Sequence, residues 1–187
     1  GGIRESGTHL LDLISDILDM SKIEAGKYEL DLEELSILKV LQLSLHMMEG
    51  RSVEAQVKIS LLNEVSEGLK LVADRRAVLQ ILLNILSNAV KFTPEQGRVD
   101  VECLERDDYI LLKITDTGIG IPAHKLASVT KPFEQVSSSY ARDHEGSGLG
   151  LAITKELIGM HGGVMSIESE LDVGTCVSVR LPKLPKI

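Results

Sequence analysis

The stretch RRAVLQILLNILSNAVKFT, residues 75–93, decides the fold of this chain. Nearly every position from 77 to 90 is apolar, which predicts a helix buried around most of its circumference. Its polar exceptions recur at helical spacing and therefore share one face: Gln80, Asn84, Asn88 and Lys91. Unpaired amides in an apolar interior cost about 1–3 kcal/mol each, so this polar face must meet something polar. Two interpretations are open: neighbouring backbone satisfies the amides, or they form the floor of a ligand site, with amide oxygens for a hard cation and an ammonium for an anion.

The composition indicates one domain with a sizeable aliphatic core plus an appendage: 187 residues, 43% hydrophobic and 3% aromatic. The net charge of −8 argues against nucleic acid as the main partner, because phosphate backbones select clustered Lys and Arg. No apolar run approaches the roughly 18 residues of a membrane span, so we expect no direct membrane contact. Cys103 and Cys176 lack metal-ligand spacing and agree with a cytoplasmic location, either free or as part of an inner-membrane protein. The start on Gly1-Gly2 suggests an excised piece of a longer protein.

Hydrophobic periodicity divides the chain into an N-terminal helical segment, 1–26, and a compact domain, 27–187. The helix predicted over 8–24 has an apolar face too wide for one partner helix, as in helical bundles, and Gly26 ends it.

In the compact domain the pattern predicts strands at 28–32, 57–61, 70–72, 98–104, 109–115, 164–169 and 176–181, and helices at 37–48, 75–93 and 149–160. Asp74 is the expected N-cap of the central helix, and the tail from Pro182 onward is expected to fray. We therefore expect an α+β fold, a two-layer sandwich with helices on one face of a mixed β-sheet, preceded by one bundle helix.

Two glycine-rich stretches follow the central helix. In DTGIGI, residues 116–121, Gly118 and Gly120 permit a positive φ and a close approach of backbone to a flat ligand. Asp116 can accept a hydrogen bond from an exocyclic amine, which favours adenine over guanine. GSGLG, residues 146–150, opens into a helix, so its N–H groups can cradle a phosphate, although it could equally be a flexible cap. Each motif alone, like the turn at 172–175, is as typical of a simple turn as of a site.

The combination is more specific than its parts. Asn84, Asn88 and Lys91-Phe92, then DTGIGI at 116–121, PFEQ at 132–135, GSGLGL at 146–151 and Gly174-Thr175 resemble, in this order, the N, G1, F, G2 and G3 boxes of the sensor histidine kinase ATP-binding domain. The likeness spans 28–182 and implies the Bergerat (GHKL) fold shared with gyrase and Hsp90. The helix at 8–24 resembles the second helix of the dimerisation and phosphoacceptor hairpin, and its sequence is similar to that of the alphaproteobacterial DivJ and PleC group.

The resemblance implies roles for individual residues. Asn88 is the implied Mg²⁺ ligand with Asn84 assisting, Lys91 lies on the phosphates, Phe92 lies near adenine, and Asp116 holds the adenine amine. Residues 146–150 wrap the phosphates, and Arg142 reaches the γ-phosphate. The remaining ATP-binding residues so implied are Gly118, Gly120, Phe133, Gly146, Ser147, Gly148, Leu149, Gly150 and Thr175.

One departure from the family concerns the phosphoacceptor box, a His followed by Glu or Asp and then Leu-Arg-x-Pro. That context is found at none of the histidines: His9, His46, His124, His144 and His161. The resemblance thus implies the ATP-binding half of a protein-histidine kinase with no catalytic residue of its own. It would donate the ATP γ-phosphoryl group to a His on another hairpin helix, for relay to an Asp of a response regulator receiver domain, and the whole protein would dimerise through the hairpin.

Two other functions stay open. Clamp ATPases of the superfamily resemble the central helix but carry a Glu where Asn84 stands, and that Glu activates water as a general base, which an amide cannot do. A degenerate scaffold that binds partners without chemistry is the third possibility, and the intact boxes argue against it.

Overall fold

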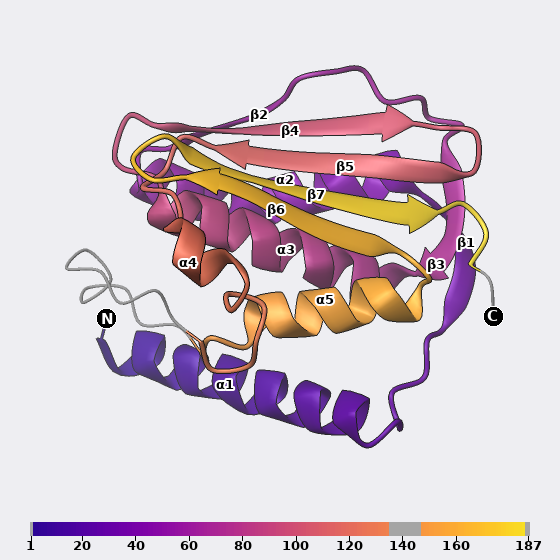
Figure 1. Ribbon diagram of the computed structural model, residues 1–187, viewed down its shortest axis with the longest axis horizontal. Coiled ribbons are helices and arrows are strands. Elements are labelled where there is room, and N and C mark those ends of the chain that lie inside the picture. Colours follow the sequence, from indigo (N-terminus) through magenta and orange to yellow (C-terminus); the bar gives the residue numbers. More distant parts are fainter. Residues whose placement is uncertain (1, 135–146, 186–187) are drawn as a thin grey trace.

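The computed structural model describes residues 2–134 and 147–185, and in the first helix the side chains at 7, 10, 11 and from 13 onward. Within this part, a five-stranded mixed sheet and a layer of helices form a two-layer sandwich (Figure 1). The α+β architecture predicted from the sequence is confirmed.

The sheet has the order β2-β4-β5-β7-β6, in which β2 and β4 are parallel and the other neighbours antiparallel. Its strands are β2 (Lys58–Leu61), β4 (Arg98–Glu105), β5 (Tyr109–Asp116), β6 (Val164–Glu170) and β7 (Gly174–Pro182). A separate antiparallel pair joins β1 (Leu32–Ser36) to β3 (Lys70–Asp74). The helices are α1 (Gly2–Glu24), α2 (Ile37–Glu54), α3 (Arg75–Phe92), the short α4 (Ala123–Leu126) and α5 (Gly150–Met160).

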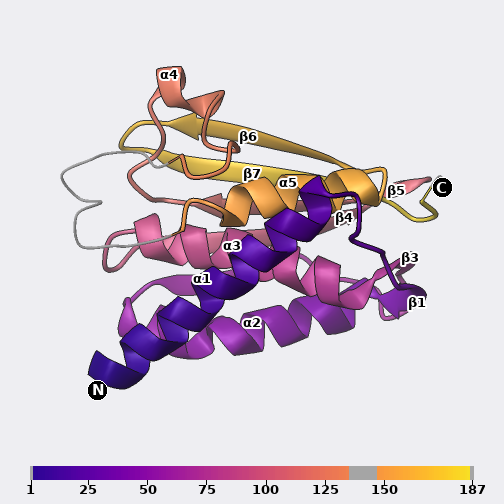
Figure 2. The ribbon, with the colours of Figure 1, turned by 90° about the horizontal axis from the view of Figure 1, so that it is seen from below.

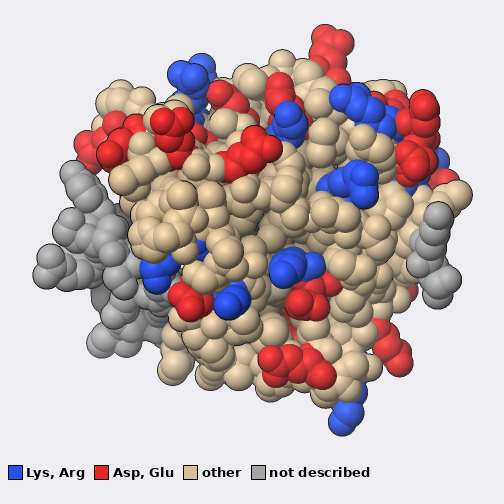
Figure 3. All heavy atoms as spheres, viewed as in Figure 1, with Lys and Arg blue, Asp and Glu red and all other residues tan. Residues whose placement is uncertain are grey.

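The strands bury alternate side chains, as a sheet covered on one face requires. Along β4 the buried residues are Val99, Val101 and Cys103, and along β5 they are Ile110, Leu112 and Ile114. These six face the helices, while the residues between them are more exposed. On the part of the surface drawn in Figure 3 that the structure describes, acidic and basic side chains are interspersed and form no single basic patch.

Helix α3 lies at the centre of the helical layer, packed against α2, α5 and β5. Its buried residues cover most of its circumference, as predicted: Ala77, Val78, Ile81, Leu82, Ile85, Leu86, Ala89 and Val90. The helix begins at the predicted N-cap, Asp74, whose Oδ1 accepts hydrogen bonds from the backbone N–H groups of Arg76 (2.8 Å) and Ala77 (3.0 Å).

Asp74 also joins two other segments. Its Oδ2 accepts from the N–H of Asp31 at 3.0 Å, and its own N–H donates to Nε2 of His161 at 3.0 Å. His161 is 1% exposed, and its Nδ1 lies 2.7 Å from the carbonyl oxygen of Leu157, to which it donates. Because Nε2 accepts from a backbone N–H, it carries no proton, and the ring links the start of α3 to the end of α5 in one tautomer.

Four boundary predictions were wrong. Helix α1 begins at Gly2 and not at the predicted Thr8. The strand expected at 28–32 lies instead at Leu32–Ser36, because pairing with β3 sets the register from Leu32↔Asp74 to Ser36↔Lys70. Helix α2 continues to Glu54, beyond the predicted end at Met48. Pro182 belongs to β7, and Lys183 exchanges backbone hydrogen bonds with Asp108 and Val72, so the tail is held there rather than frayed.

Helix α1 lies outside the two layers, beside α5 (Figures 1 and 2). None of the helices among residues 2–134 and 147–185 combines the length and the apolar run that a bilayer span requires.

We expect Asp74→Ala to lower the free energy of unfolding by about 1–2 kcal/mol, because the first N–H groups of α3 lose their acceptor in a buried place. Asp74→Asn is the matched control, since its amide oxygen still caps Arg76 and Ala77 while it loses, as Ala does, the acceptor of the Asp31 N–H. Urea unfolding followed by circular dichroism measures both. An Ala variant as stable as the Asn variant would contradict the capping role.

Candidate functional site

The predicted motifs meet at one end of the sandwich, where β5 and α3 end, β6 turns into β7 and α5 begins (Figure 1). The backbone joins three of them directly. The N–H of Ile119 donates to the carbonyl oxygen of Phe92 at 3.1 Å, and the N–H of Asp172 donates to the carbonyl oxygen of Ile119 at 2.8 Å. Asp116 and Thr175 are paired across β5 and β7. The turn after β5 is thus fixed between the end of α3 and the β6–β7 turn.

Asp116 is a buried carboxylate, 8% exposed. Its Oδ1 accepts from the N–H groups of Gly118 (2.8 Å) and Thr175 (3.1 Å). Among the described residues, Oδ2 has no hydrogen-bond partner. Burial raises the pKa of the Asp116 carboxyl, and the two N–H donors offset this only in part. A donor at Oδ2 would favour the ionised form, so the site is suited to a ligand N–H group.

Close backbone contacts favour glycine at both positions of DTGIG, and at Gly120 a positive φ does so as well. Gly120 has the predicted positive φ, +71°, and an added Cβ would lie 2.0 Å from the carbonyl oxygen of Glu170. Gly118 does not adopt the positive φ that glycine permits. A Cβ there would instead lie 2.5 Å from the carbonyl oxygen of Phe92. Close packing of the turn against the protein's own backbone accounts for both glycines.

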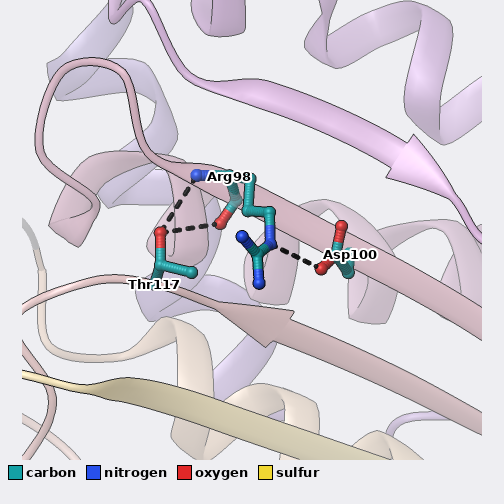
Figure 4. A network of polar contacts seen from close by, with 3 residues as sticks. All are labelled: Arg98, Asp100 and Thr117. Carbon is teal, nitrogen blue, oxygen red and sulfur yellow. Dashed lines mark hydrogen bonds and ion pairs between the residues drawn. The ribbon is translucent and has the colours of Figure 1, made fainter.

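A threonine missed by sequence reasoning holds the other side of this turn (Figure 4). Oγ1 of Thr117 accepts from the N–H of Arg98 at 3.0 Å, and the N–H of Thr117 donates to the carbonyl oxygen of Arg98 at 3.1 Å. The Arg98 guanidinium pairs with Asp100, with Nε 3.0 Å from Oδ2. Ser169 was missed too: its Oγ accepts from the N–H of Ile121 and lies 2.8 Å from Oγ1 of Thr175. Only the position of Thr117 inside DTGIG could have suggested such a role.

The polar face of α3 divides into satisfied and open groups. Gln80 donates from Nε2 to Oδ2 of Asp19 on α1 at 3.2 Å. Asn84 donates from Nδ2 to the carbonyl oxygen of Gly150 (3.1 Å) and to Oγ1 of Thr154 (3.2 Å). The half-buried Asn88 amide has no hydrogen-bond partner among the described residues. Neighbouring protein groups therefore satisfy Gln80 and Asn84, while a ligand site at Asn88 stays a prediction.

Lys91 and Phe92 end α3 beside this open amide. The Lys91 Nζ lies 5.0 Å from the centre of the Phe92 ring, and burial lowers the pKa of Lys91. An anion bound next to Lys91 would favour its charged form. The residue thus supplies a partly desolvated cation close to Asn88.

The described part of the GSGLG loop is fastened on both sides. Oγ of Ser147 accepts from the N–H of Leu149 (3.1 Å) and donates to Oδ2 of Asp16 on α1 (3.0 Å). Gly148 has a φ of +68°, and its carbonyl oxygen accepts from the N–H of Phe133 at 3.0 Å. Leu149 is buried, whereas the Phe133 side chain is 69% exposed, so only its backbone anchors the loop. Two predicted site residues, Arg142 and Gly146, lie outside the described residues.

Comparison with known proteins gives the family. Residues 73–185, more than half of the chain, match the model described as "Histidine kinase-, DNA gyrase B-, and HSP90-like ATPase". The "Non-motile and phage-resistance protein" of Caulobacter vibrioides is 47% identical over 184 residues, 96% of this chain and 22% of that protein. The histidine protein kinase DivJ of the same species is 43% identical over 182 residues, 97% of this chain and 30% of that protein. The chain therefore spans less than a third of the length of either relative, and the predicted likeness to the DivJ group is confirmed.

Solved structures of histidine kinases have the same fold as this chain. Full-length ShkA in complex with AMPPNP superposes with a TM-score of 0.81 at 32% identity, over 97% of this chain and 37% of that one. The catalytic domain of histidine kinase ThkA has a TM-score of 0.69 at 22% identity, over 83% of this chain and 97% of that one, which supports the fold. This chain belongs to the family of histidine kinase-, DNA gyrase B- and HSP90-like ATPases.

Proposed function

We propose that this chain is the ATP-binding catalytic part of a sensor histidine kinase, which donates the γ-phosphoryl group of ATP to a histidine on a hairpin helix outside these 187 residues. The observation that carries the proposal is the buried Asp116 carboxylate, with one oxygen held by two backbone N–H groups and the other without a partner among the described residues. Adenine presents an exocyclic amine to such an acceptor, whereas guanine presents a carbonyl oxygen that would face it unfavourably.

The phosphates and a divalent cation fit the other half of the site. Asn88 offers an amide oxygen, which Mg²⁺ accepts as a ligand, and Mg²⁺ also binds substrate phosphates. Asn84 assists by lying next to Asn88 on the same face of α3, and Lys91 contributes a positive charge to the phosphates. The described residues contain no cluster of His, Cys, Asp or Glu that could hold a metal by itself. The cation would therefore enter with the nucleotide, neutralising phosphate charge in the transfer step.

The remaining ATP contacts come from the turns around the site. Phe92 and Phe133 border the base, Gly118, Gly120 and Thr175 shape the adenine end, and residues 146–150 wrap the phosphates together with Arg142.

Phosphoryl transfer is favoured over clamp ATPase activity by the state of Asn84. Its Nδ2 is committed to Gly150 and Thr154, and an amide does not accept a proton from water. With an amide at position 84 instead of a general base, water is a poor nucleophile, and a positioned histidine is the better one.

The partners follow from the same proposal. Helix α1 exposes large apolar side chains at Leu10, Leu11, Ile14, Ile17 and Leu18. Such a face is typical of a helix that completes a bundle, so the whole protein would form a homodimer through its hairpin. The phosphorylated histidine would then pass its phosphoryl group to the receiver domain of a response regulator in the cytoplasm.

Adenine selection by Asp116 is tested with ATP and ITP, which lacks the exocyclic amine. Asp116→Ala should weaken ATP binding by about 10–100-fold, the effect of one charge-assisted hydrogen bond, and leave ITP binding nearly unchanged. Calorimetric titration measures both affinities. Asp107→Ala removes an exposed carboxylate as the matched control. An equal loss of both nucleotides would indicate misfolding rather than adenine recognition.

The metal role of Asn88 is tested with Asn88→Ala, titrated with ATP in the presence of Mg²⁺ and again in excess chelator. We expect the variant to lose the gain in affinity that Mg²⁺ gives the unaltered protein, because the amide oxygen is gone, while its affinity for metal-free ATP persists. Unchanged far-UV circular dichroism serves as the folding control. If Mg²⁺ strengthens ATP binding equally in both proteins, Asn88 is not a ligand.

The kinase assignment is tested with γ-labelled ATP. Alone, the 187-residue chain should bind ATP without labelling itself and with negligible phosphate release. Adding a separate helical hairpin that carries the acceptor His should give acid-labile label on the hairpin, slowly because the reaction is then bimolecular. Robust label on the chain alone, or steady ATP turnover, would contradict the proposal.

A further inference from the structure

Helix α1 is docked on the side of the domain that holds the candidate nucleotide site. It lies beside α5 in both ribbon views (Figures 1 and 2). Met20 and Ile23, near its C-terminal end, pack against the hydrophobic core. Farther toward its N-terminus the contacts become polar, and these polar contacts reach residues of the site itself.

Two carboxylates on one face of α1 make those contacts, since residues three apart are neighbours on a helix. Asp19 accepts from Nε2 of Gln80, on the same face of α3 as Asn84, at 3.2 Å. Asp16 accepts from Oγ of Ser147, in the glycine-rich loop, at 3.0 Å. The second contact matters more, because Ser147 lies in the segment that would wrap the phosphates.

The single hydrogen-bond donor of the Ser147 hydroxyl is already in use in this state. A serine hydroxyl has one proton to donate. Oγ of Ser147 gives it to Asp16 and accepts from the N–H of Leu149. While Asp16 holds this proton, the hydroxyl cannot donate to a phosphate oxygen. A phosphate at the loop would also repel the Asp16 carboxylate, because both are anionic.

We propose that Asp16 and the phosphates of a bound nucleotide compete for the Ser147 hydroxyl, so that docking of α1 and nucleotide binding oppose each other. The proposal rests on the nucleotide-binding function proposed above. Coupling between two binding events is reciprocal. The α1 contact therefore weakens nucleotide binding by the same factor by which nucleotide weakens the docking of α1.

The hydrogen bond of Asp16 can break while the rest of the α1 interface stays in place. Met20 and Ile23 are anchored by apolar packing that does not involve Ser147. Nucleotide would therefore loosen α1 first around Asp16 and leave its C-terminal end in place. Since α1 has an exposed apolar face, this releases a helix that is able to pack elsewhere while the domain stays attached.

The test measures nucleotide affinity of the 187-residue chain by calorimetry. Asp16→Ala should bind ATP about three- to tenfold more tightly than the unaltered chain, the effect of removing one competing hydrogen bond. Glu24→Ala, which removes an exposed carboxylate from the same helix, should leave ATP affinity unchanged. Adenosine, which has no phosphates, should bind all three proteins equally.

A double-mutant cycle separates competition for Ser147 from other effects. In a Ser147→Ala background, Asp16→Ala should strengthen ATP binding less than it does in the unaltered chain, because only the repulsion between carboxylate and phosphate is then removed. An undiminished gain would refute competition for the hydroxyl. Amide hydrogen exchange around residues 13–19 should also become faster when the unaltered chain is saturated with ATP, and Asp16→Ala should show the fast exchange without nucleotide.

The outcomes distinguish the two proposals. If the unaltered chain binds ATP but Asp16→Ala binds it with the same affinity, or if Glu24→Ala strengthens binding as much, the competition is refuted and the nucleotide-binding function stands. An equal gain for adenosine also refutes it. If the unaltered chain binds no ATP, the proposed function and the competition both fall, while the exchange data still report whether Asp16 fastens α1.

Discussion

Burial of α3 is the constraint on which the rest of the structure depends. A helix that is apolar around most of its circumference must be enclosed, here by the sheet, α2 and α5, and every polar group on it then needs a partner. Asn84 and Gln80 meet this demand by bonding to α5 and α1. Asn88 does not meet it within the described residues, and it lies next to Lys91, a lysine whose pKa is lowered by burial. The amide that has no protein partner among the described residues thus lies near the C-terminal end of α3, where the proposed cation and phosphates would bind.

Asp116, like Asn88, is a polar side chain whose hydrogen bonding is incomplete among the described residues. Among the described residues its carboxylate is bonded to two backbone N–H groups, both on one oxygen, and burial raises its pKa despite them. A fold selected for stability alone would be expected to fill this position with a neutral side chain of similar size. The turn that holds Asp116 is nevertheless fixed on both sides. Thr117 is hydrogen-bonded to Arg98 on one side, and Gly120 packs closely against the backbone of Glu170 on the other. Such rigid support for an unfavourable charge is what preorganised ligand recognition requires.

The sequence predicts the features that depend on local pattern, and fails where a feature depends on a distant partner. The central helix, its Asp74 cap and the strands from β4 onward follow from periodicity and short-range chemistry. The first strand was misplaced because YELDL alternates well, while the true register is set by β3, some forty residues later. Equally, spacing puts Gln80, Asn84 and Asn88 on one face, but only the positions of α1 and α5 decide which amides are satisfied. The close packing of Gly118 against Phe92 is likewise invisible in a sequence that offers positive φ as the simpler explanation.

The charge of the chain explains why the contact between Asp16 on α1 and Ser147 in the glycine-rich loop matters. The chain has a net charge of −8, and the proposed ligand is a polyanion, so attraction must come from local groups and not from the overall field. Under the proposed function, Lys91, backbone N–H groups of the glycine-rich loop and a cation brought with the nucleotide would supply it over short distances. In that setting a single carboxylate placed on one hydroxyl of the loop has a large relative effect, because few favourable groups are available to outweigh it. Asp16 on α1 is such a carboxylate. Because α1 also has an exposed apolar face, nucleotide binding would be linked to the ability of this helix to pack elsewhere.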